Sequence, residues 1–234
     1  MDRLWLLVAV VSLFGAGMMG AAPPPRQDRQ AAYDRERAAY EAKRDATYRE
    51  DKVLDIAGVK PAMVVGELGA GDGYFTMKLA PRVGPRGKVY ANDILQGGLA
   101  DLRLRAKQAG FSNIETILGT ESDPRLPKGL LDMVFLVRTL HDLDRPAEML
   151  ETLAPSLKPG ATMVIVELEN EARDATDEAH SLTRRDFLDI FAKTQYTIER
   201  IDKSLPDPRS VVFILSRKKV PSRDYGTGRL EGAR

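Results

Sequence analysis

An apolar run followed by three evenly spaced glycines is the feature that most restricts the fold of this chain. Residues 64–74 read VVGELGAGDGY, with glycines at positions 69, 71 and 73. Glycine adopts left-handed backbone conformations without steric cost, so the segment can turn tightly and let a ligand approach the backbone. The turn also leaves backbone N–H groups at a helix N-terminus, which favours anionic ligand groups. We therefore predict a strand, a ligand-binding loop and a helix.

The spacing of the glycines distinguishes between ligands. A dinucleotide loop of the form G-x-G-x-x-G would place its third glycine at the position of Tyr74. Glu67 precedes the loop, where a carboxylate would repel a pyrophosphate but suits the ammonium of an amino acid. Asp93 ends the next expected strand, where an acidic side chain can accept both ribose hydroxyls. Together these residues indicate a nucleoside that carries an amino-acid moiety, namely S-adenosylmethionine (SAM).

Strand and helix patterns alternate through the rest of the chain. Helices are expected over 74–82, 99–108, 146–157 and 183–193, the last with Thr183 as N-cap. Strands are expected over 62–68, 88–94, 113–119, 131–137 and 161–169, and 196–205 and 210–218 should form a closing hairpin. Such alternation predicts an α/β fold with a mostly parallel sheet and helices on both faces.

The two ends of the chain differ from this central region. Residues 4–25 are uncharged and lead to a cleavage site after Ala22, so we expect 1–22 to be a signal peptide of a periplasmic or secreted protein. The alternative is an uncleaved membrane anchor. Residues 23–51 should form a charged helical extension, either a solvated helix or a lid, ahead of a main domain at 52–218. The polar tail at 219–234 should be disordered.

Five segments in a fixed order resemble the class I SAM-dependent methyltransferases. They read VVGELGAGDGYFT, VGPRGKVYANDI, LGTESDPRLP, DMVFLVRTLHDLDRP and LKPGATMVIVE, and the likeness covers about residues 51–218. The chain looks most similar to bacterial small-molecule methyltransferases, including a group of exported proteins. The resemblance implies SAM as cofactor and a Rossmann-like sheet of seven strands, mostly parallel, with an antiparallel strand from the C-terminal hairpin.

The resemblance also implies a set of cofactor-binding residues. Asp93 would bind the ribose and Ile94 would flank the adenine. Glu121, next to Thr120, would lie near the adenine amino group. Asp123 is the alternative, because the acidic residue of the family often follows the glycine directly, and in this chain Thr120 stands at that position. Arg138 departs from the family pattern and could clamp a carboxylate of SAM or of a substrate. The loop around the methionine end would be formed by Glu67, Gly69, Ala70, Gly71, Gly73 and Tyr74.

His141 is the candidate catalytic base, since it follows the fourth expected strand at the edge where ligands bind. Its other reading is a structural one, as a hydrogen-bonding residue of the turn over 142–146. His180 should be a surface or lid residue. We expect no metal site, because the chain has two histidines and no cysteine.

Transfer of a methyl group to an oxygen or carbon of a small molecule is the expected function. The alternatives are a non-catalytic SAM- or nucleoside-binding protein, which export away from cytosolic SAM would favour, and a protein carboxyl methyltransferase. An NAD-dependent oxidoreductase disagrees with Glu67 and Tyr74. The net charge of +1 and the lack of a basic, aromatic-laced patch predict no nucleic-acid partner. After signal cleavage we expect no stable membrane insertion, and the oligomeric state stays open.

Overall fold

The computed structural model describes residues 26–171 and 182–218. The predicted signal peptide, the predicted disordered tail and His180 lie outside these residues. The chain divides into two compact units, residues 1–40 and 41–234. Helix α1 (Arg26–Tyr48) begins in the first unit, where Arg37 bonds to Asp34 at 3.0 Å and lies over the Tyr33 ring at 5.4 Å. Among the helices of the described residues, none is long and apolar enough to cross a membrane.

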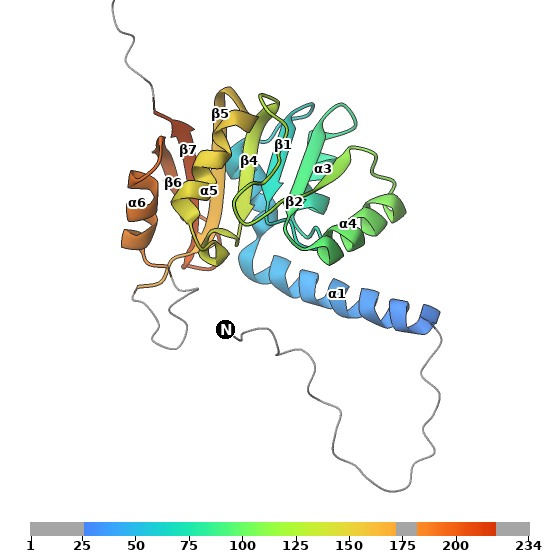
Figure 1. Ribbon diagram of the computed structural model, residues 1–234. Coiled ribbons are helices and arrows are strands. Elements are labelled where there is room, and N and C mark those ends of the chain that lie inside the picture. The colour runs from blue at the N-terminus through green and yellow to red at the C-terminus, as the bar shows by residue number, and fades with distance from the viewer. Residues whose placement is uncertain (1–25, 172–181, 219–234) are drawn as a thin grey trace, which may run out of the picture. The chain divides into compact units, whose positions relative to one another are not determined.

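A sheet of seven strands within the described residues forms the centre of the second unit (Figure 1). The five strands from β1 to β5 pair in parallel, and β7 pairs antiparallel with both β5 and β6. The order β3-β2-β1-β4-β5-β7-β6 confirms the predicted Rossmann-like sheet and its antiparallel hairpin. The strands are β1 (Val64–Leu68), β2 (Lys88–Asp93), β3 (Ile114–Leu118), β4 (Leu131–Val137), β5 (Leu157–Leu168), β6 (Tyr196–Asp202) and β7 (Ser210–Arg217).

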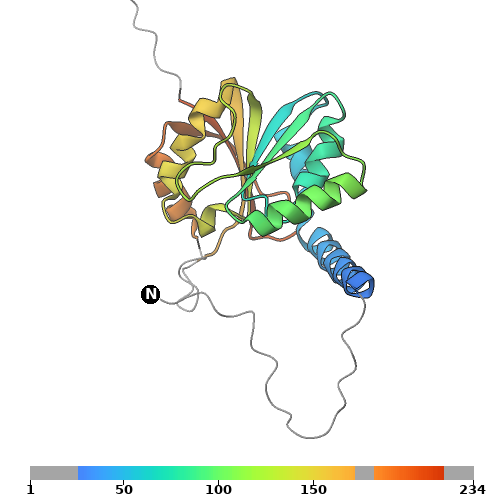
Figure 2. The same ribbon diagram turned by 45° about the vertical axis from the view of Figure 1, so that its right-hand side comes forward.

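Helices cover both faces of the sheet (Figure 2), and side chains of the central strands alternate between the two apolar cores that these helices cover. In β4, Val134 joins one core and Phe135 the other. The first core contains Phe187 of α6 (Arg184–Ala192), and the second contains Leu79 of α3 (Thr76–Val83). The other helices are α2 (Val53–Ala57), α4 (Gln96–Gln108) and α5 (Pro146–Thr152), with 3-10 turns at Glu50–Lys52, Leu140–Asp142 and Ala154–Ser156.

Several boundaries differ from those predicted. Helix α3 begins at Thr76 rather than at position 74, after a turn over residues 71–75 in which Gly73 has φ of 90°. Helix α4 begins at Gln96, three residues earlier than predicted. The predicted helix over 146–157 was wrong at its end: Pro155 lies in a 3-10 turn, and Leu157 already pairs with β4. Thr183 is confirmed as N-cap of α6.

Candidate functional site

A cleft of about 550 Å³ lies where the strand order reverses, at the carboxyl ends of β1, β2 and β4. In open α/β sheets this is the place where ligands bind, and the volume suits a small cofactor with part of a substrate. The residues that line it are Leu68, Gly69, Gly71, Asn92, Asp93, Ile94, Leu95, Thr120, Glu121, Arg138, Thr139, Asp142, Leu143, Asp144 and Met149.

The glycine loop between β1 and α3 forms one wall of this cleft. Gly69 has φ of 75°, and a Cβ atom there would collide with the side chain of Thr139. Gly71 also lines the cleft and donates its backbone N–H to Asp93 Oδ2 at 2.7 Å. At Gly73 a Cβ atom would collide with Leu102 of α4. The first two glycines therefore shape the ligand wall, whereas the third lets α4 approach the loop closely.

Four of the residues predicted to form the methionine loop pack away from the cleft and stabilise the loop. Glu67 is buried at the end of β1 and accepts a hydrogen bond from the Thr76 hydroxyl. Tyr74 is buried, and its hydroxyl donates to Asp45 at 2.5 Å. Ala70 packs in a small apolar cluster. None of these three side chains, nor Gly73, is among the residues lining the cleft in the described part of the chain.

The last turns of α1, which belong to the second unit, are joined to the glycine loop by charged side chains. Asp45 Oδ1 lies 2.7 Å from Lys78 Nζ, on the helix that follows the loop. Glu41 Oε1 lies 2.6 Å from Arg105 Nη2, and Nη1 of the same guanidinium donates to the Asp72 carbonyl at 2.8 Å. These contacts join the last turns of α1 to the loop at Asp72, to α3 at Lys78 and to α4 at Arg105.

Asp93 presents a carboxylate at the end of β2. Its Oδ1 accepts the N–H of Leu95 at 2.8 Å and its Oδ2 accepts the N–H of Gly71. The two backbone donors hold the carboxylate, and each oxygen keeps a second lone pair. A carboxylate in this position can accept the two neighbouring hydroxyls of a ribose, so the site fits the nucleoside part of SAM.

The predicted adenine residues lie beside Asp93. Ile94 is 51% exposed and lines the cleft, as do Thr120 and Glu121. The rival acidic residue, Asp123, accepts the N–H of Arg125 at 2.8 Å and does not line the cleft. The geometry therefore favours Glu121 over Asp123 as the acidic residue near the base.

A histidine and a buried glutamate form a pair beside the cleft. His141 Nδ1 lies 2.8 Å from Glu167 Oε2, and Glu167 Oε1 accepts the N–H of Leu140 at 2.7 Å. Burial disfavours the imidazolium, but the hydrogen bond to Glu167 and its charge outweigh that effect and raise the pKa of His141 above its ordinary value. His141 does not itself line the cleft, although Thr139 and Asp142 on either side of it do.

Arg138 follows β4 with φ of 60°, a left-handed conformation that costs a non-glycine residue about 1–3 kcal/mol. Its backbone N–H donates to the Val166 carbonyl at 2.8 Å, which anchors this turn to β5. The half-buried side chain lines the cleft, with its guanidinium 5.2 Å from the centre of the Tyr48 ring. Strained residues of this kind cluster at functional sites.

Sequence reasoning did not find several residues of this region. Asn92 lies within the strand before Asp93, and its side chain donates to the Pro124 carbonyl at 2.7 Å, which fixes the loop after β3. Glu167 lies 26 residues from His141, so only the parallel pairing of β4 and β5 reveals their contact. An acidic residue at the end of a buried strand, as in VIVELE, was the available signal. The other unpredicted lining residues are Leu68, Leu95, Thr139, Asp142, Leu143, Asp144 and Met149.

Known proteins resemble this chain in sequence and in fold. It is 25% identical over 179 residues to the demethylmenaquinone methyltransferase of Lactococcus lactis, which covers 75% of this chain and 71% of that protein. It is 29% identical over 113 residues to a protein-L-isoaspartate O-methyltransferase of Pyrococcus horikoshii, about half of either chain. The crystal structure of a SAM-dependent methyltransferase from Aquifex aeolicus matches with a TM-score of 0.67 at 25% identity, covering 74% of this chain and 92% of that one.

The sheet order, the glycine loop and the carboxylate of Asp93 define a SAM-dependent methyltransferase of the class I fold. A family model described as a methyltransferase domain matches residues 59–202, which is more than half of the chain. The chain therefore belongs to this methyltransferase family, and its cofactor is SAM, as predicted.

Proposed function

We propose that this enzyme transfers the methyl group of SAM to an oxygen or carbon atom of a small molecule that must lose a proton. The observation that carries the proposal is the pair formed by His141 and Glu167 at the ends of β4 and β5, next to the cleft. Among its relatives are proteins named as quinone C-methyltransferases, which fits an acceptor of this kind.

SAM supplies an activated methyl group on its sulfonium, so the protein needs chiefly to align the acceptor and exclude water. Asp93 and the glycine loop would hold the nucleoside and the methionine end. With Nδ1 facing Glu167, the imidazole of His141 turns its Nε2 toward Asp142 Oδ1, 3.5 Å away. Nε2 would then take the proton of the acceptor, and Glu167 would stabilise the resulting imidazolium.

The main alternative is a protein carboxyl methyltransferase, because an isoaspartate O-methyltransferase is also a relative. A carboxylate acceptor is already ionised at neutral pH and needs no base. The buried Glu167 next to His141 would have no chemical role in such a reaction, so the pair favours an acceptor with a hydroxyl or an acidic C–H. A non-catalytic SAM-binding protein would not need the pair either.

Calorimetry with the SAM-related ligands tests the cofactor half of the proposal. The full chain is titrated with SAM, S-adenosylhomocysteine and NAD, with Asp93→Ala as the variant. We expect micromolar binding of the first two, a loss of about 10- to 100-fold in the variant for a hydrogen-bonded charged group, and no binding of NAD. Equal affinity of both proteins for SAM would remove Asp93 from the site.

Transfer of radiolabelled methyl groups tests the acceptor half. Purified protein with labelled SAM is given hydroquinones, hydroxylated aromatic acids, and a protein or RNA extract in separate reactions. We expect label in a small molecule, and a fall of about 10²- to 10⁴-fold in turnover for His141→Gln with SAM binding retained. Label found only in protein or RNA, or a His141→Gln enzyme with full turnover, would overturn this half.

We also propose that the chain is exported, on the basis of the apolar run at residues 4–14 and the small residues before position 23. Fractionation of expressing cells, with sequencing of the N-terminus of the recovered protein, tests this. A periplasmic protein that begins at Pro23 would agree with cleavage, whereas membrane-bound protein that still begins at Met1 would indicate an anchor. Protein recovered from the cytosol would contradict both.

A further inference from the structure

Arg138 is the one basic residue among the described residues that line the cleft. The acidic residues of the lining are Asp93, Glu121, Asp142 and Asp144. A cleft with this distribution favours positive groups of a ligand along most of its wall and can receive a negative group at a single place. That place is at the end of β4, near His141 in the sequence. Asp93, whose carboxylate would bind the ribose, is at the end of β2.

The guanidinium of Arg138 is held in place while its N–H donors have no acceptor among the described residues. Within the described part of the chain this guanidinium makes no hydrogen bond or ion pair, and it lies over the face of the Tyr48 ring. The anchored left-handed backbone fixes where the side chain starts, and the stacked ring restricts its plane. A guanidinium carries five N–H donors in a fixed fork that matches a carboxylate in a bidentate geometry.

The nearby carboxylate that could neutralise Arg138 is held by another residue. Asp207 accepts the backbone N–H of Arg209 at 2.8 Å, and its Oδ2 lies 3.2 Å from Arg209 Nη2. Burial opposes ionisation of Asp207, but these bonds and the charges of Arg209 and Arg138 together lower its pKa below the usual value. Asp207 is therefore ionised and already paired with Arg209, which leaves the donors of Arg138 available to a ligand in the cleft that this residue lines.

We infer that Arg138, held by Tyr48, is a carboxylate-binding subsite at the boundary between the methyl donor and the methyl acceptor. Two ligands of this enzyme can supply such a group: the methionine end of SAM, and an acceptor that itself carries a carboxylate. The second source rests on the proposed function, and the first rests on the cofactor alone. Both sources use the same bidentate chemistry, and they predict different ligand dependence.

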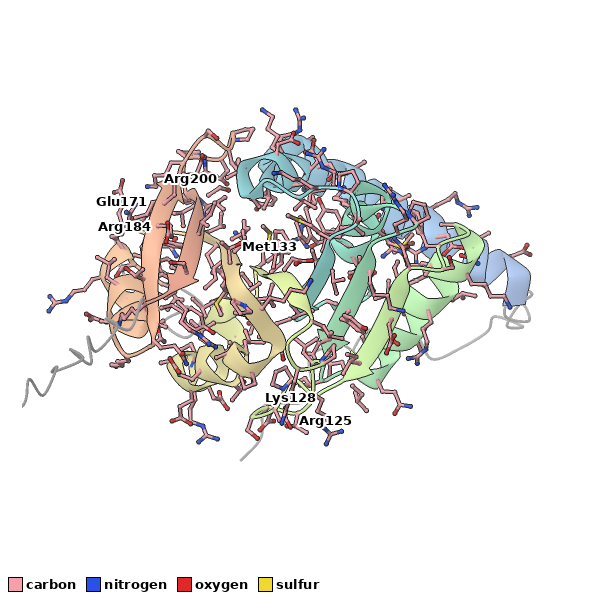
Figure 3. All side chains as sticks on the ribbon, turned by 90° about the horizontal axis from the view of Figure 1, so that it is seen from above. Arg125, Lys128, Met133, Glu171, Arg184 and Arg200 are labelled. Carbon is pink, nitrogen blue, oxygen red and sulfur yellow. The ribbon has the colours of Figure 1, made fainter. Side chains whose placement is uncertain are left out.

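The experiment compares ligands that differ only in the carboxylate. Wild-type chain, Arg138→Gln and Arg125→Gln are titrated with S-adenosylhomocysteine and with 5′-methylthioadenosine, which lacks the amino-acid portion. The complexes saturated with S-adenosylhomocysteine are then titrated with 4-hydroxybenzoate and with 4-hydroxybenzyl alcohol. Arg125 is a matched control, because it is also a left-handed arginine (φ of 53°) but is exposed and lies outside the cleft lining, at the margin of the molecule in Figure 3.

Two results would support the inference. If the donor supplies the carboxylate, Arg138→Gln binds S-adenosylhomocysteine about 10- to 100-fold more weakly and 5′-methylthioadenosine unchanged. If the acceptor supplies it, S-adenosylhomocysteine binding is unchanged and binding of 4-hydroxybenzoate falls by a similar factor, with no effect on the alcohol. In either case Tyr48→Leu gives a smaller loss for the same ligand, and Arg125→Gln gives none.

Two results would overturn it. The first is equal affinity of wild type and Arg138→Gln for S-adenosylhomocysteine and for 4-hydroxybenzoate, which includes the case where neither protein binds the benzoate. The second is an equal loss for both nucleosides, which would mean that Arg138 only supports the fold. Methyl transfer that fails in the wild type while the carboxylate effect on S-adenosylhomocysteine persists would refute the proposed function and leave the subsite.

Discussion

At the scale of single residues, the buried carboxylate of Glu167 links the strand β5 to the turn after β4. One oxygen accepts the N–H of Leu140 and the other faces His141. This arrangement fixes the tautomer and the ring plane of the imidazole. A histidine without such a partner would not be oriented in this way. Glu167 is 2% exposed, so loss of its charge removes a strong local interaction rather than a solvent-screened one.

We predict that Glu167→Gln lowers the pKa of His141 toward its ordinary value. The glutamine oxygen can still accept the N–H of Leu140, so the fold should be retained while the negative charge is lost. Because the chain has two histidines, His180→Gln leaves a single imidazole signal for NMR titration. The midpoint should lie above about 6.5 in that background and fall when Glu167→Gln is added. An unchanged midpoint would show that Glu167 does not act on His141.

The same shift makes stability depend on pH. A folded-state pKa that lies above the unfolded value stabilises the fold fully below the unfolded pKa, and this stabilisation is lost as pH rises through the folded pKa. The free energy of unfolding in urea should therefore show a component that falls as pH rises from about 6 to 8. This component should be absent in Glu167→Gln, and its persistence there would place its source elsewhere.

At the scale of elements, the glycine loop joins β1 to two helices as well as to the ligand. Gly71 donates its N–H to Asp93. Gly73 has no side chain, which leaves room for Leu102 of α4 to pack against it. A change at either glycine therefore acts on different properties: ligand binding at the first and helix packing at the second.

We predict that Gly73→Ala destabilises the fold by about 2–4 kcal/mol, from the unfavourable backbone conformation together with overpacking against Leu102. Gly110→Ala is the matched control, because Gly110 has φ of 74° and open space around its Cβ position. It should cost only about 1 kcal/mol. Urea unfolding of both variants makes the comparison, and similar losses in the two would exclude the packing role of Gly73.

Elements were predictable from the sequence to the extent that their signals are local. The strand β4 was predicted with the limits that the structure has, because its sequence LDMVFLV is apolar except for Asp132, as is typical of a buried strand. The beginning of α4 was missed, since it depends on the N–H of Leu95 bonding to Asp93 rather than on apolar spacing. The pairing of His141 with Glu167 was also missed, because it depends on which strands become neighbours in the sheet.

At the scale of the whole molecule, the boundary between the two units lies within α1, between Tyr40 and Glu41. The residues just after it carry the contacts to the glycine loop, through Glu41 and Asp45. The charged extension predicted as one piece over 23–51 therefore contains a segment that belongs to the methyltransferase body.

We predict that removal of residues 1–40 leaves thermal unfolding and SAM affinity close to those of the chain lacking residues 1–22. Removal of residues 1–47, which keeps Tyr48, should weaken SAM binding several-fold, because the glycine loop loses the partners of Arg105 and Lys78. Differential scanning calorimetry and SAM titration of the three proteins provide the comparison. Full affinity in the shortest protein would show that the last turns of α1 do not position the loop.

The position of β7 has a consequence for synthesis. Among the strands of the described residues this one comes last in the sequence, yet it lies between β5 and β6 and hydrogen-bonds to both. Until residues 210–217 emerge, one edge of β5 has no partner, although its side chains are largely buried in the finished protein. A nascent chain cannot complete this sheet before these residues emerge, and a chain that stops earlier is left with an unpaired strand edge that can pair with another chain. The order of strands thus delays completion of the sheet until residues 210–217 have been synthesised, and such a delay would suit the unfolded passage through a translocation pore that the proposed export requires.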